Sequence, residues 1–193
     1  SLEPRDAVEL RTVDLEHAPA VTALLADVAP NEVFHLAGQS SVGQSFNDPA
    51  GTYRSIVSTT LNLLEACRKY RIQKFVLASS SSVYGDSPRT PFREDDPLGR
   101  ALSPYGATKR AAEDLCATYA HVHDLRPTVL RYFTVYGPAG RPDMSAFRFV
   151  QWVSEGRPVK IFGDGSQSRD FTFVDDIARG TLAALDGGEG GTF

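Results

Sequence analysis

Short apolar runs alternate with longer amphipathic runs along most of this chain, and this alternation constrains the fold more than any other feature. The apolar runs predict β-strands, which we expect at residues 8–15, 32–38, 74–79 and 127–133. The runs between them carry apolar residues at helical spacing and predict helices at 18–29, 48–70 and 103–123. Nearly continuous apolar strands separated by helices predict a parallel sheet with helices on both faces. We therefore expect an α/β protein with a doubly wound parallel sheet.

The pattern changes after about residue 136, where a loop rich in glycine and proline begins. A helix is expected at 145–156, a strand with a turn at 159–165 and a last helix at 173–185. The tail at 186–193 is expected to form a turn.

The composition limits the partners that this chain can have. Its 193 residues are 41% hydrophobic and 23% charged with a net charge of −4, which is typical of a globular protein with one sizeable core. No cluster of Lys and Arg stands out, so we expect neither a nucleic acid nor a membrane as partner. His121 and His123 do not share a helical face, so no metal site is expected. The two cysteines fall in expected helices, and no stretch has the apolar length of a signal peptide or membrane span, which favours a cytoplasmic protein.

A doubly wound sheet binds its ligand outside the carboxyl ends of its strands. The loops expected there span residues 36–47, 79–103 and 133–145. The second of these loops begins with four consecutive serines, from Ser79 to Ser82. A hydroxyl at this strand end would face the substrate crevice.

Tyr105 and Lys109 open the helix that follows this loop. They are four residues apart, so they share a helical face, and a nearby ammonium favours the phenolate. The pair thus predicts a tyrosine with a lowered pKa that can act as a general base. The spacing alone is weak, because Tyr70 and Lys74 repeat it and two surface residues would also show it. A strand-end serine beside the Tyr105 pair would form a proton relay suited to oxidising or reducing a secondary alcohol.

Five stretches in order resemble the extended short-chain dehydrogenases/reductases, specifically the NAD-dependent nucleotide-sugar epimerases and dehydratases. The stretches are VFHLAGQSSVGQSFNDP, KFVLASSSSVYGD, SPYGATKRAAE, LRYFTVYGPAGRPDM and IFGDGSQSRDFTFVDDIA. The resemblance covers essentially the whole chain. It implies a Rossmann-like fold, NAD as cofactor, a UDP-sugar as substrate and a homodimer formed through helices 48–70 and 103–123.

The resemblance also implies roles for individual residues. Tyr105 would be the catalytic base, Lys109 its partner bonded to the nicotinamide ribose, and Ser80 the catalytic hydroxyl, 25 residues before the tyrosine. The implied cofactor-binding residues, besides Tyr105 and Lys109, are Asp14, Leu15, Leu36, Ala37, Gly38, Ser40, Ser55 and Phe133. The implied substrate-binding residues are Ser80, Ser81, Thr134, Arg141, Ser145, Lys160, Phe162 and Arg169.

The sequence departs from the family pattern in one large feature, the glycine fingerprint after the first strand, which is absent. The resemblance therefore implies an NAD-binding domain at 1–136 without its first βαβ unit. It further implies part of a substrate-binding domain at 137–173, and a helix and tail at 174–193 that return to the first domain. Ser40 stands where one epimerase subgroup often has lysine.

Ser81 and Ser82 bear on the reaction. The 4,6-dehydratases of this family carry Asp-Glu at these two positions, because elimination of water needs an extra acid and base. Serine serves poorly in either role near neutral pH, so the sequence favours a 4-epimerase, which inverts C4 through a transient 4-keto sugar with one base. A 4,6-dehydratase and a non-catalytic Rossmann-like binding module remain the alternatives.

The identity of the sugar stays open. Thr134 and Arg141 match residues that hold the sugar carboxylate in UDP-glucuronate 4-epimerases, and an arginine fork suits a carboxylate. Gly43 instead makes the loop after the strand expected at 32–38 more similar to that of the enzymes for UDP-glucose or UDP-N-acetylglucosamine. Arg141 could equally be a loop residue that braces Asp143.

Overall fold

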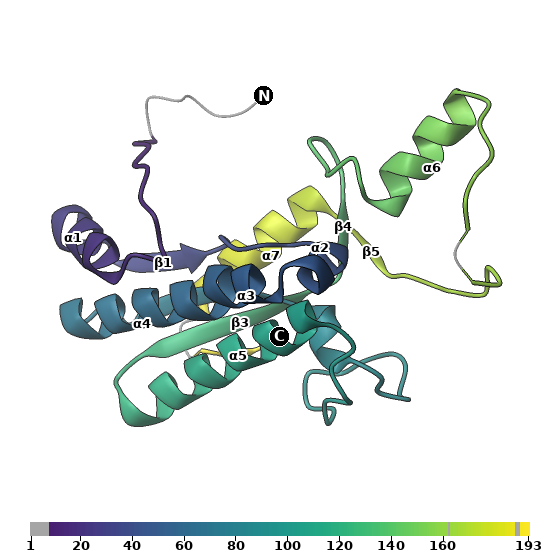
Figure 1. The fold of residues 1–193 in the computed structure, drawn as a ribbon. Coiled ribbons are helices and arrows are strands. Elements are labelled where there is room, and N and C mark those ends of the chain that lie inside the picture. Colours follow the sequence, from purple (N-terminus) through teal and green to yellow (C-terminus); the bar gives the residue numbers. More distant parts are fainter. Residues whose placement is uncertain (1–7, 162, 188–189) are drawn as a thin grey trace.

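A four-stranded parallel sheet lies at the centre of the computed structural model, which describes residues 8–161, 163–187 and 190–193 (Figure 1). Its strands, in the spatial order β1-β2-β3-β6, are β1 (Glu32–His35), β2 (Lys74–Ser80), β3 (Arg126–Tyr132) and β6 (Gly191–Thr192). Every neighbouring pair is parallel, with Val33 beside Phe75 and Val76 beside Thr128. The predicted α/β fold with a parallel sheet is confirmed. β6 is an addition, because the sequence predicts only a turn in that tail.

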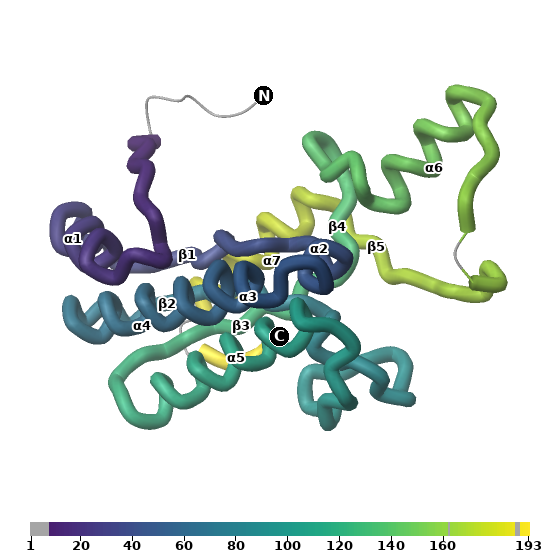
Figure 2. The backbone as a smooth tube through the Cα atoms, viewed as in Figure 1, coloured from purple at the N-terminus to yellow at the C-terminus, as the bar shows by residue number. Residues whose placement is uncertain are grey.

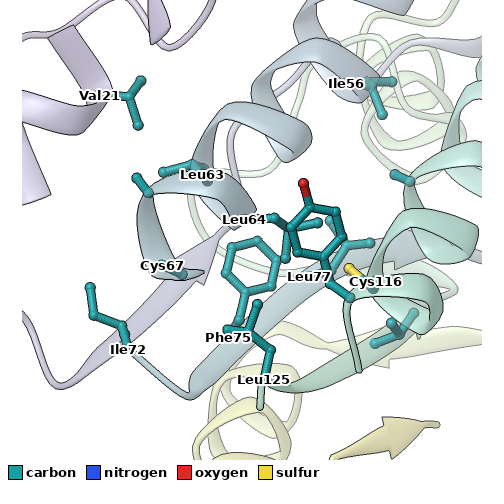
Figure 3. Close-up of a cluster of buried hydrophobic side chains, with 14 of the residues drawn as sticks. Val21, Ile56, Leu63, Leu64, Cys67, Ile72, Phe75, Leu77, Cys116 and Leu125 are labelled. Carbon is teal, nitrogen blue, oxygen red and sulfur yellow. The ribbon is translucent and has the colours of Figure 1, made fainter. Parts of the chain in front are cut away.

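Helices cover both faces of this sheet, as its continuous apolar strands predict. One face carries α1 (Ala18–Val28), α4 (Thr59–Tyr70) and α5 (Pro104–Val122), and the other carries α7 (Val174–Asp186) (Figure 1). Phe75 and Leu77 on β2 point into the larger core with Leu64 of α4, all 1% exposed or less (Figure 3). Val76 alternates with them and packs against Leu185 of α7. Each buried side chain of this size contributes about 1.5–3 kcal/mol, so β2 anchors both helical layers.

The helix predicted at 48–70 forms in three parts: α3 (Pro49–Tyr53), a π-helical turn (Arg54–Ser58) and α4. It begins as predicted, because Asp48 accepts a hydrogen bond from the Gly51 amide at 2.8 Å and Pro49 occupies the first turn. The sequence predicts neither the π turn nor the short helix α2 (Val42–Asn47) that precedes α3.

A second sheet lies beyond β3, formed by two parallel strands, β4 (Thr134–Tyr136) and β5 (Phe171–Phe173). The chain between them contains α6 (Ser145–Ser154) and extends away from the main sheet (Figure 2). The helices predicted at 145–156 and 173–185 are confirmed by α6 and α7. Of the strand and turn predicted at 159–165, the turn is confirmed at 163–165, whereas the strand is wrong for the described residues, where Ile161 is 59% exposed and pairs with no strand.

The strand predicted at 8–15 is also wrong. Val8 and Leu10 are 76% and 87% exposed, and no strand in the described part of the chain lies beside them to share hydrogen bonds. Arg11 instead pairs with Asp27 of α1 at 3.0 Å. An apolar run favours a strand only where a neighbouring strand is available.

Cys67 and Cys116, the two cysteines in the expected helices, are buried and free. No helix in the described ranges is long and apolar enough to cross a membrane.

Candidate active site

The serine run lies at the carboxyl end of β2. The strand ends at Ser80, and a single 3-10 turn (Ser81–Tyr84) follows at once. Ser80 Oγ accepts a hydrogen bond from the Ser82 amide at 3.2 Å, so this side chain caps the turn. Ser80 also shares a side-chain hydrogen bond with Tyr105. The strand-end serine and the tyrosine thus meet.

The start of α5 explains how Tyr105 reaches this serine turn. Ser103 Oγ accepts a hydrogen bond from the Gly106 amide at 3.0 Å, and Pro104 occupies the first turn, so the helix begins here. A Cβ atom on Gly106 would lie 2.8 Å from the Ser82 carbonyl oxygen, a steric overlap. Glycine therefore lets the first turn of α5 pack directly on the turn after Ser80.

Lys109 lies one helical turn below Tyr105. It is 7% exposed, and its Nζ donates to the Ala78 carbonyl oxygen on β2 at 2.6 Å. The same Nζ lies 5.9 Å from the centre of the Tyr105 ring. Burial lowers the pKa of Lys109 to about 8, while the nearby Glu113 carboxylate acts in the opposite direction.

The pKa of Tyr105 differs from the prediction. Burial raises it, whereas the hydrogen bond with Ser80 and the positive charge of Arg141 partly offset that rise. The predicted lowering of this pKa by Lys109 is therefore wrong for the chain by itself. Burial destabilises the charged phenolate by more than the nearby positive charge stabilises it.

A buried ionic network lies next to Lys109 on α5, and the sequence analysis does not predict it. Glu113 and Arg131 form an ion pair at 2.8 Å with both side chains 9% exposed. Ser79 donates a hydrogen bond to Glu113, and Arg131 Nη1 donates to the Tyr84 hydroxyl at 3.3 Å. One sequence signal was available, because Glu113 follows Lys109 by four residues on the same helical face.

The loop after β1 lies at the carboxyl end of the strand next to β2. Leu36 is 61% exposed, and Gly38 has a φ of +138°, a backbone conformation that disfavours side chains. A Cβ atom on Gly38 would lie 3.2 Å from the Ser55 carbonyl oxygen. The Gln39 amide donates to Ser55 Oγ at 3.3 Å, so the π turn holds this loop. The structure thus groups Leu36, Ala37 and Gly38 with Ser55.

His35 lies beneath this loop and is 2% exposed. Its Nε2 lies 3.1 Å from Thr60 Oγ1, whereas Nδ1 has no hydrogen-bond partner in the described residues. Burial, aided by the charge of Lys109, lowers the pKa of His35 to about 4. His35 is therefore a packed histidine beneath the loop.

Asp14 and Leu15 lie further along the same helical layer. The Asn62 side chain on α4 donates to the Leu15 carbonyl oxygen at 2.8 Å, and Leu15 packs against the larger core. Asp14 is exposed, and its Oδ1 accepts from the Glu16 amide at 2.9 Å.

Arg141 reaches the loop after β1 from the loop after β4. Its Nη1 donates to the carbonyl oxygen and to Oγ of Ser40, both at 2.9 Å, and its Nε donates to Asp143 Oδ1 at 2.9 Å. The positive charge of Arg141 acts on the phenol of Tyr105 and lowers its pKa, although burial outweighs this effect. The bracing contact with Asp143, one of the two roles considered for Arg141, is present.

The other expected site residues are more dispersed. Phe133 lies between β3 and β4, with its ring centre 6.3 Å from that of Tyr84. Thr134 is partly buried in β4, whereas Ser145 is exposed at the start of α6. Ser81 is partly buried beside Ser80, Lys160 and Arg169 are exposed between α6 and β5, and Phe162 lies outside the described residues.

Comparisons with known proteins match this arrangement. The model of the NAD dependent epimerase/dehydratase family matches residues 1–193. A UDP-glucuronate 4-epimerase of Thermodesulfobacterium geofontis is 50% identical over 174 residues, which cover 90% of this chain and 53% of that protein. UDP-glucuronate 4-epimerase 4 of Arabidopsis thaliana is 39% identical over 196 residues, which cover 100% of this chain and 45% of that protein.

Solved structures give the same relationship. The UDP-glucuronic acid 4-epimerase of Bacillus cereus, in complex with UDP-glucuronic acid and NAD, is 40% identical with a TM-score of 0.84 and covers 93% of this chain and 57% of its own. The UDP-glucose 4-epimerase of Thermus thermophilus, in complex with NAD, is 33% identical with a TM-score of 0.85 and covers 100% of this chain and 66% of its own. The chain spans about half the length of the curated relatives it matches. With a match along all of its residues and a Rossmann-like parallel sheet, the chain belongs to the NAD dependent epimerase/dehydratase family.

Proposed function

We propose that this chain is part of an NAD-dependent 4-epimerase of a UDP-linked sugar, with UDP-glucuronate as the first substrate to test. The observation that carries the proposal is the packing of the first turn of α5, which carries Tyr105, on the turn after Ser80 at the carboxyl end of β2. The positive charge of Arg141 also acts on the Tyr105 phenol and favours a lower pKa. A hydroxyl pair next to a guanidinium suits the oxidation of an alcohol on a sugar that also bears a carboxylate.

The residues present fit a dinucleotide. The loop of Leu36, Ala37 and Gly38 offers exposed backbone where a side chain at Gly38 would crowd Ser55. The Lys109 ammonium has three donors, and its bond to the Ala78 carbonyl uses one of them, which leaves donors for ribose hydroxyls. When bound, NAD supplies a reversible hydride acceptor. The NAD named in the Bacillus cereus and Thermus thermophilus structures supports this choice.

Tyr105 would hold and return the proton of the sugar C4 hydroxyl. Its hydrogen bond with Ser80 gives the phenol a partner that orients its oxygen, and the charge of Arg141 favours the phenolate. Lys109 is held beside β2 through its bond to the Ala78 carbonyl oxygen. Serines at 81 and 82 offer no acid–base pair for dehydration, which supports epimerisation over elimination.

Arg141 and Thr134 would hold the carboxylate of a uronic acid. The high identity to proteins named UDP-glucuronate 4-epimerases supports this sugar, and UDP-glucose remains the alternative. The domain division at 1–136, 137–173 and 174–193 belongs to the same proposal. It is supported by the second sheet and by the return of α7 to the main sheet.

The test uses the natural full-length polypeptide that carries these residues and a panel of UDP-sugars followed by NMR. We expect UDP-galacturonate from UDP-glucuronate, and a smaller or absent conversion of UDP-glucose to UDP-galactose. A 4-keto-6-deoxy product in place of any epimer would overturn the proposal in favour of a dehydratase. Absence of both products and of NAD binding would favour a non-catalytic module.

A matched pair of variants tests the role of Tyr105. Tyr105→Phe removes the proton-carrying oxygen and should lower kcat by about 10²- to 10⁴-fold. Tyr70→Phe is the control, because Tyr70 also precedes a lysine by four residues but ends α4 on the opposite side of the fold from the carboxyl ends. Equal rates in the two variants would show that Tyr105 is not the base.

A homodimer through the helices at 48–70 and 103–123 is also part of the proposal. Tyr53 of α3 is 53% exposed and Leu61 of α4 is 38% exposed, which leaves apolar surface on these helices. Light scattering of the full-length polypeptide should give twice the monomer mass, and a monomer at micromolar concentration would contradict it.

A further inference from the structure

The guanidinium of Arg141 forms hydrogen bonds with two residues, Asp143 and Ser40. Nε donates to Asp143 Oδ1 at 2.9 Å and Nη2 donates to Asp143 Oδ2, which is a bidentate ion pair. Nη1 donates to both oxygens of Ser40, each at 2.9 Å. Arg141 therefore links the loop after β4 to the loop after β1, across 101 residues of sequence.

A donor count limits what else Arg141 can bind. A guanidinium has five N–H donors. The four hydrogen bonds to Asp143 and Ser40 use four of them, so one Nη2 hydrogen has no partner in the described part of the chain. An incoming carboxylate could accept one hydrogen bond from Arg141 as it stands. Bidentate binding requires that one present partner leaves.

Asp143 is the partner that can leave at lower cost. Its side chain is 46% exposed, so its carboxylate can turn into water and regain hydration. Ser40 accepts partly through its backbone carbonyl, which moves only if the loop after β1 moves. Asp143 also lies on the edge formed by Nε and Nη2, where a second carboxylate would form the same two bonds.

From this geometry we infer that Asp143 is a specificity-determining residue: an internal carboxylate that a substrate carboxylate must displace from Arg141. The inference rests on the proposed function, because it takes the substrate to be a UDP-linked uronic acid. A UDP-linked neutral hexose leaves the Arg141–Asp143 pair intact, since it brings no competing carboxylate. A uronic acid exchanges one bidentate pair for another and releases Asp143 to solvent.

The exchange sets the apparent affinity for uronic acids. Arg141 is available only in the fraction of molecules in which Asp143 has released it, and the apparent dissociation constant rises in inverse proportion to that fraction. Neutral sugars do not incur this factor. Asp143 thus weakens uronic-acid binding and leaves neutral-sugar binding nearly unchanged.

The test compares Asp143→Asn with Glu155→Gln in the full-length polypeptide by calorimetric binding of UDP-glucuronate, UDP-glucose and UDP. Glu155 is a matched control, because it pairs with Arg157 at 3.0 Å over the same two-residue spacing and is also exposed. Asp143→Asn should lower the Kd of UDP-glucuronate about threefold to fivefold, the range of a well-aligned exposed ion pair. The Kd values of UDP-glucose and UDP should change less than about twofold, and Glu155→Gln should change none of the three.

Three results would overturn the inference. A higher Kd for UDP-glucuronate in Asp143→Asn would show that Asp143 orients Arg141 for the substrate and does not compete with it. Equal tightening for all three ligands would show a general charge effect on the pyrophosphate. No change for any ligand would show that Asp143 does not occupy the substrate's place.

Arg141→Met separates this inference from the proposed function. Loss of UDP-glucuronate binding in Arg141→Met, with no effect of Asp143→Asn, would sink the inference alone. If Arg141→Met binds UDP-glucuronate and UDP-glucose with the same Kd values as the parent, UDP-glucuronate is rejected as the proposed substrate. Absence of any UDP-sugar binding by the parent would reject both.

Discussion

The candidate site draws its residues from two regions that are stabilised in different ways. In the main sheet, Phe75 and Leu64 are 0% exposed and Tyr105 and Lys109 rest on a packed core. In the region from β4 to β5, by contrast, no side chain of α6 is buried within the described residues, and Val150 is 72% exposed. The difference shows that the groups proposed to react stand on a well-packed support, whereas the groups proposed to hold the substrate depend on few contacts, such as that of Arg141 with Ser40.

The largest difference should appear on truncating Phe75. Phe75→Ala removes a fully buried ring from the core beneath β2 and should lower the free energy of unfolding by about 3–5 kcal/mol. Urea denaturation measures this loss. A loss below about 1 kcal/mol would mean that the core relaxes around the cavity, and the contrast between the two regions would fail.

The two arginine pairs give the next comparison. Arg131→Met leaves the Glu113 carboxylate buried without its cation and should destabilise the fold by about 3–5 kcal/mol. Arg141→Met breaks a pair whose side chains are 39% and 46% exposed, and should cost less than about 1 kcal/mol. Both are read from urea unfolding at one pH. Equal losses would show that Arg141 is a structural anchor comparable to Arg131.

His35 should make the main sheet sensitive to acid. Its pKa is about 4 in the folded state against 6.5 for a free side chain. Between these two pH values, His35 is protonated in the unfolded chain and neutral in the folded one. The free energy of unfolding therefore has its full value above pH 6.5 and falls as the pH drops toward 4, by up to about 3 kcal/mol. Unfolding measured at pH 7.5 and 5 should therefore show a fall of about 2 kcal/mol from this group, and His35→Gln should lack it.

The region from β4 to β5 supplies a built-in contrast for that experiment. Residues 137–173 contain no histidine, so no histidine titration there adds to the fall between pH 7.5 and 5. If the parent and His35→Gln lose stability in parallel, the imidazole of His35 does not carry the effect.

The smallest effect should come from α6. Val150→Ser replaces a side chain that is 72% exposed and should change the free energy of unfolding by no more than about 0.5 kcal/mol. Urea unfolding of the full-length polypeptide is the measurement. A loss above about 2 kcal/mol would mean that another surface covers α6 in solution, which would sharpen the comparison by locating that surface.

The sequence predicts the main sheet better than its margins. β1, β2, β3 and the helices between them follow from runs whose apolar pattern is satisfied locally. The strand predicted at 8–15 and the one predicted at the start of 159–165 do not form in the described residues, because a strand also needs a neighbour, which the run itself cannot specify.

The candidate site shows the same division. The contact of Ser80 with Tyr105 follows from a spacing, a strand end and a helix start, all of which are local signals. The direction of the Tyr105 pKa does not follow, because burial depends on everything packed around the phenol. The network of Ser79, Glu113 and Arg131 joins β2, α5 and β3, so no single stretch of sequence displays it.

The π-helical turn at Arg54–Ser58 divides the long helical segment from Pro49 to Tyr70 into two parts. Their side-chain faces are rotated relative to each other around the helix axis. Successive residues of an α-helix are about 100° apart around its axis, so the residue added by a π turn offsets the faces on either side by about that angle. Deleting one residue within the turn would restore a single phase. The buried face of α4 would stay against the core, while α3 and the bond between Ser55 and Gln39 would rotate out of place. Chain length at this one position therefore sets the rotation of α3, and of the loop after β1 that Ser55 holds, relative to α4.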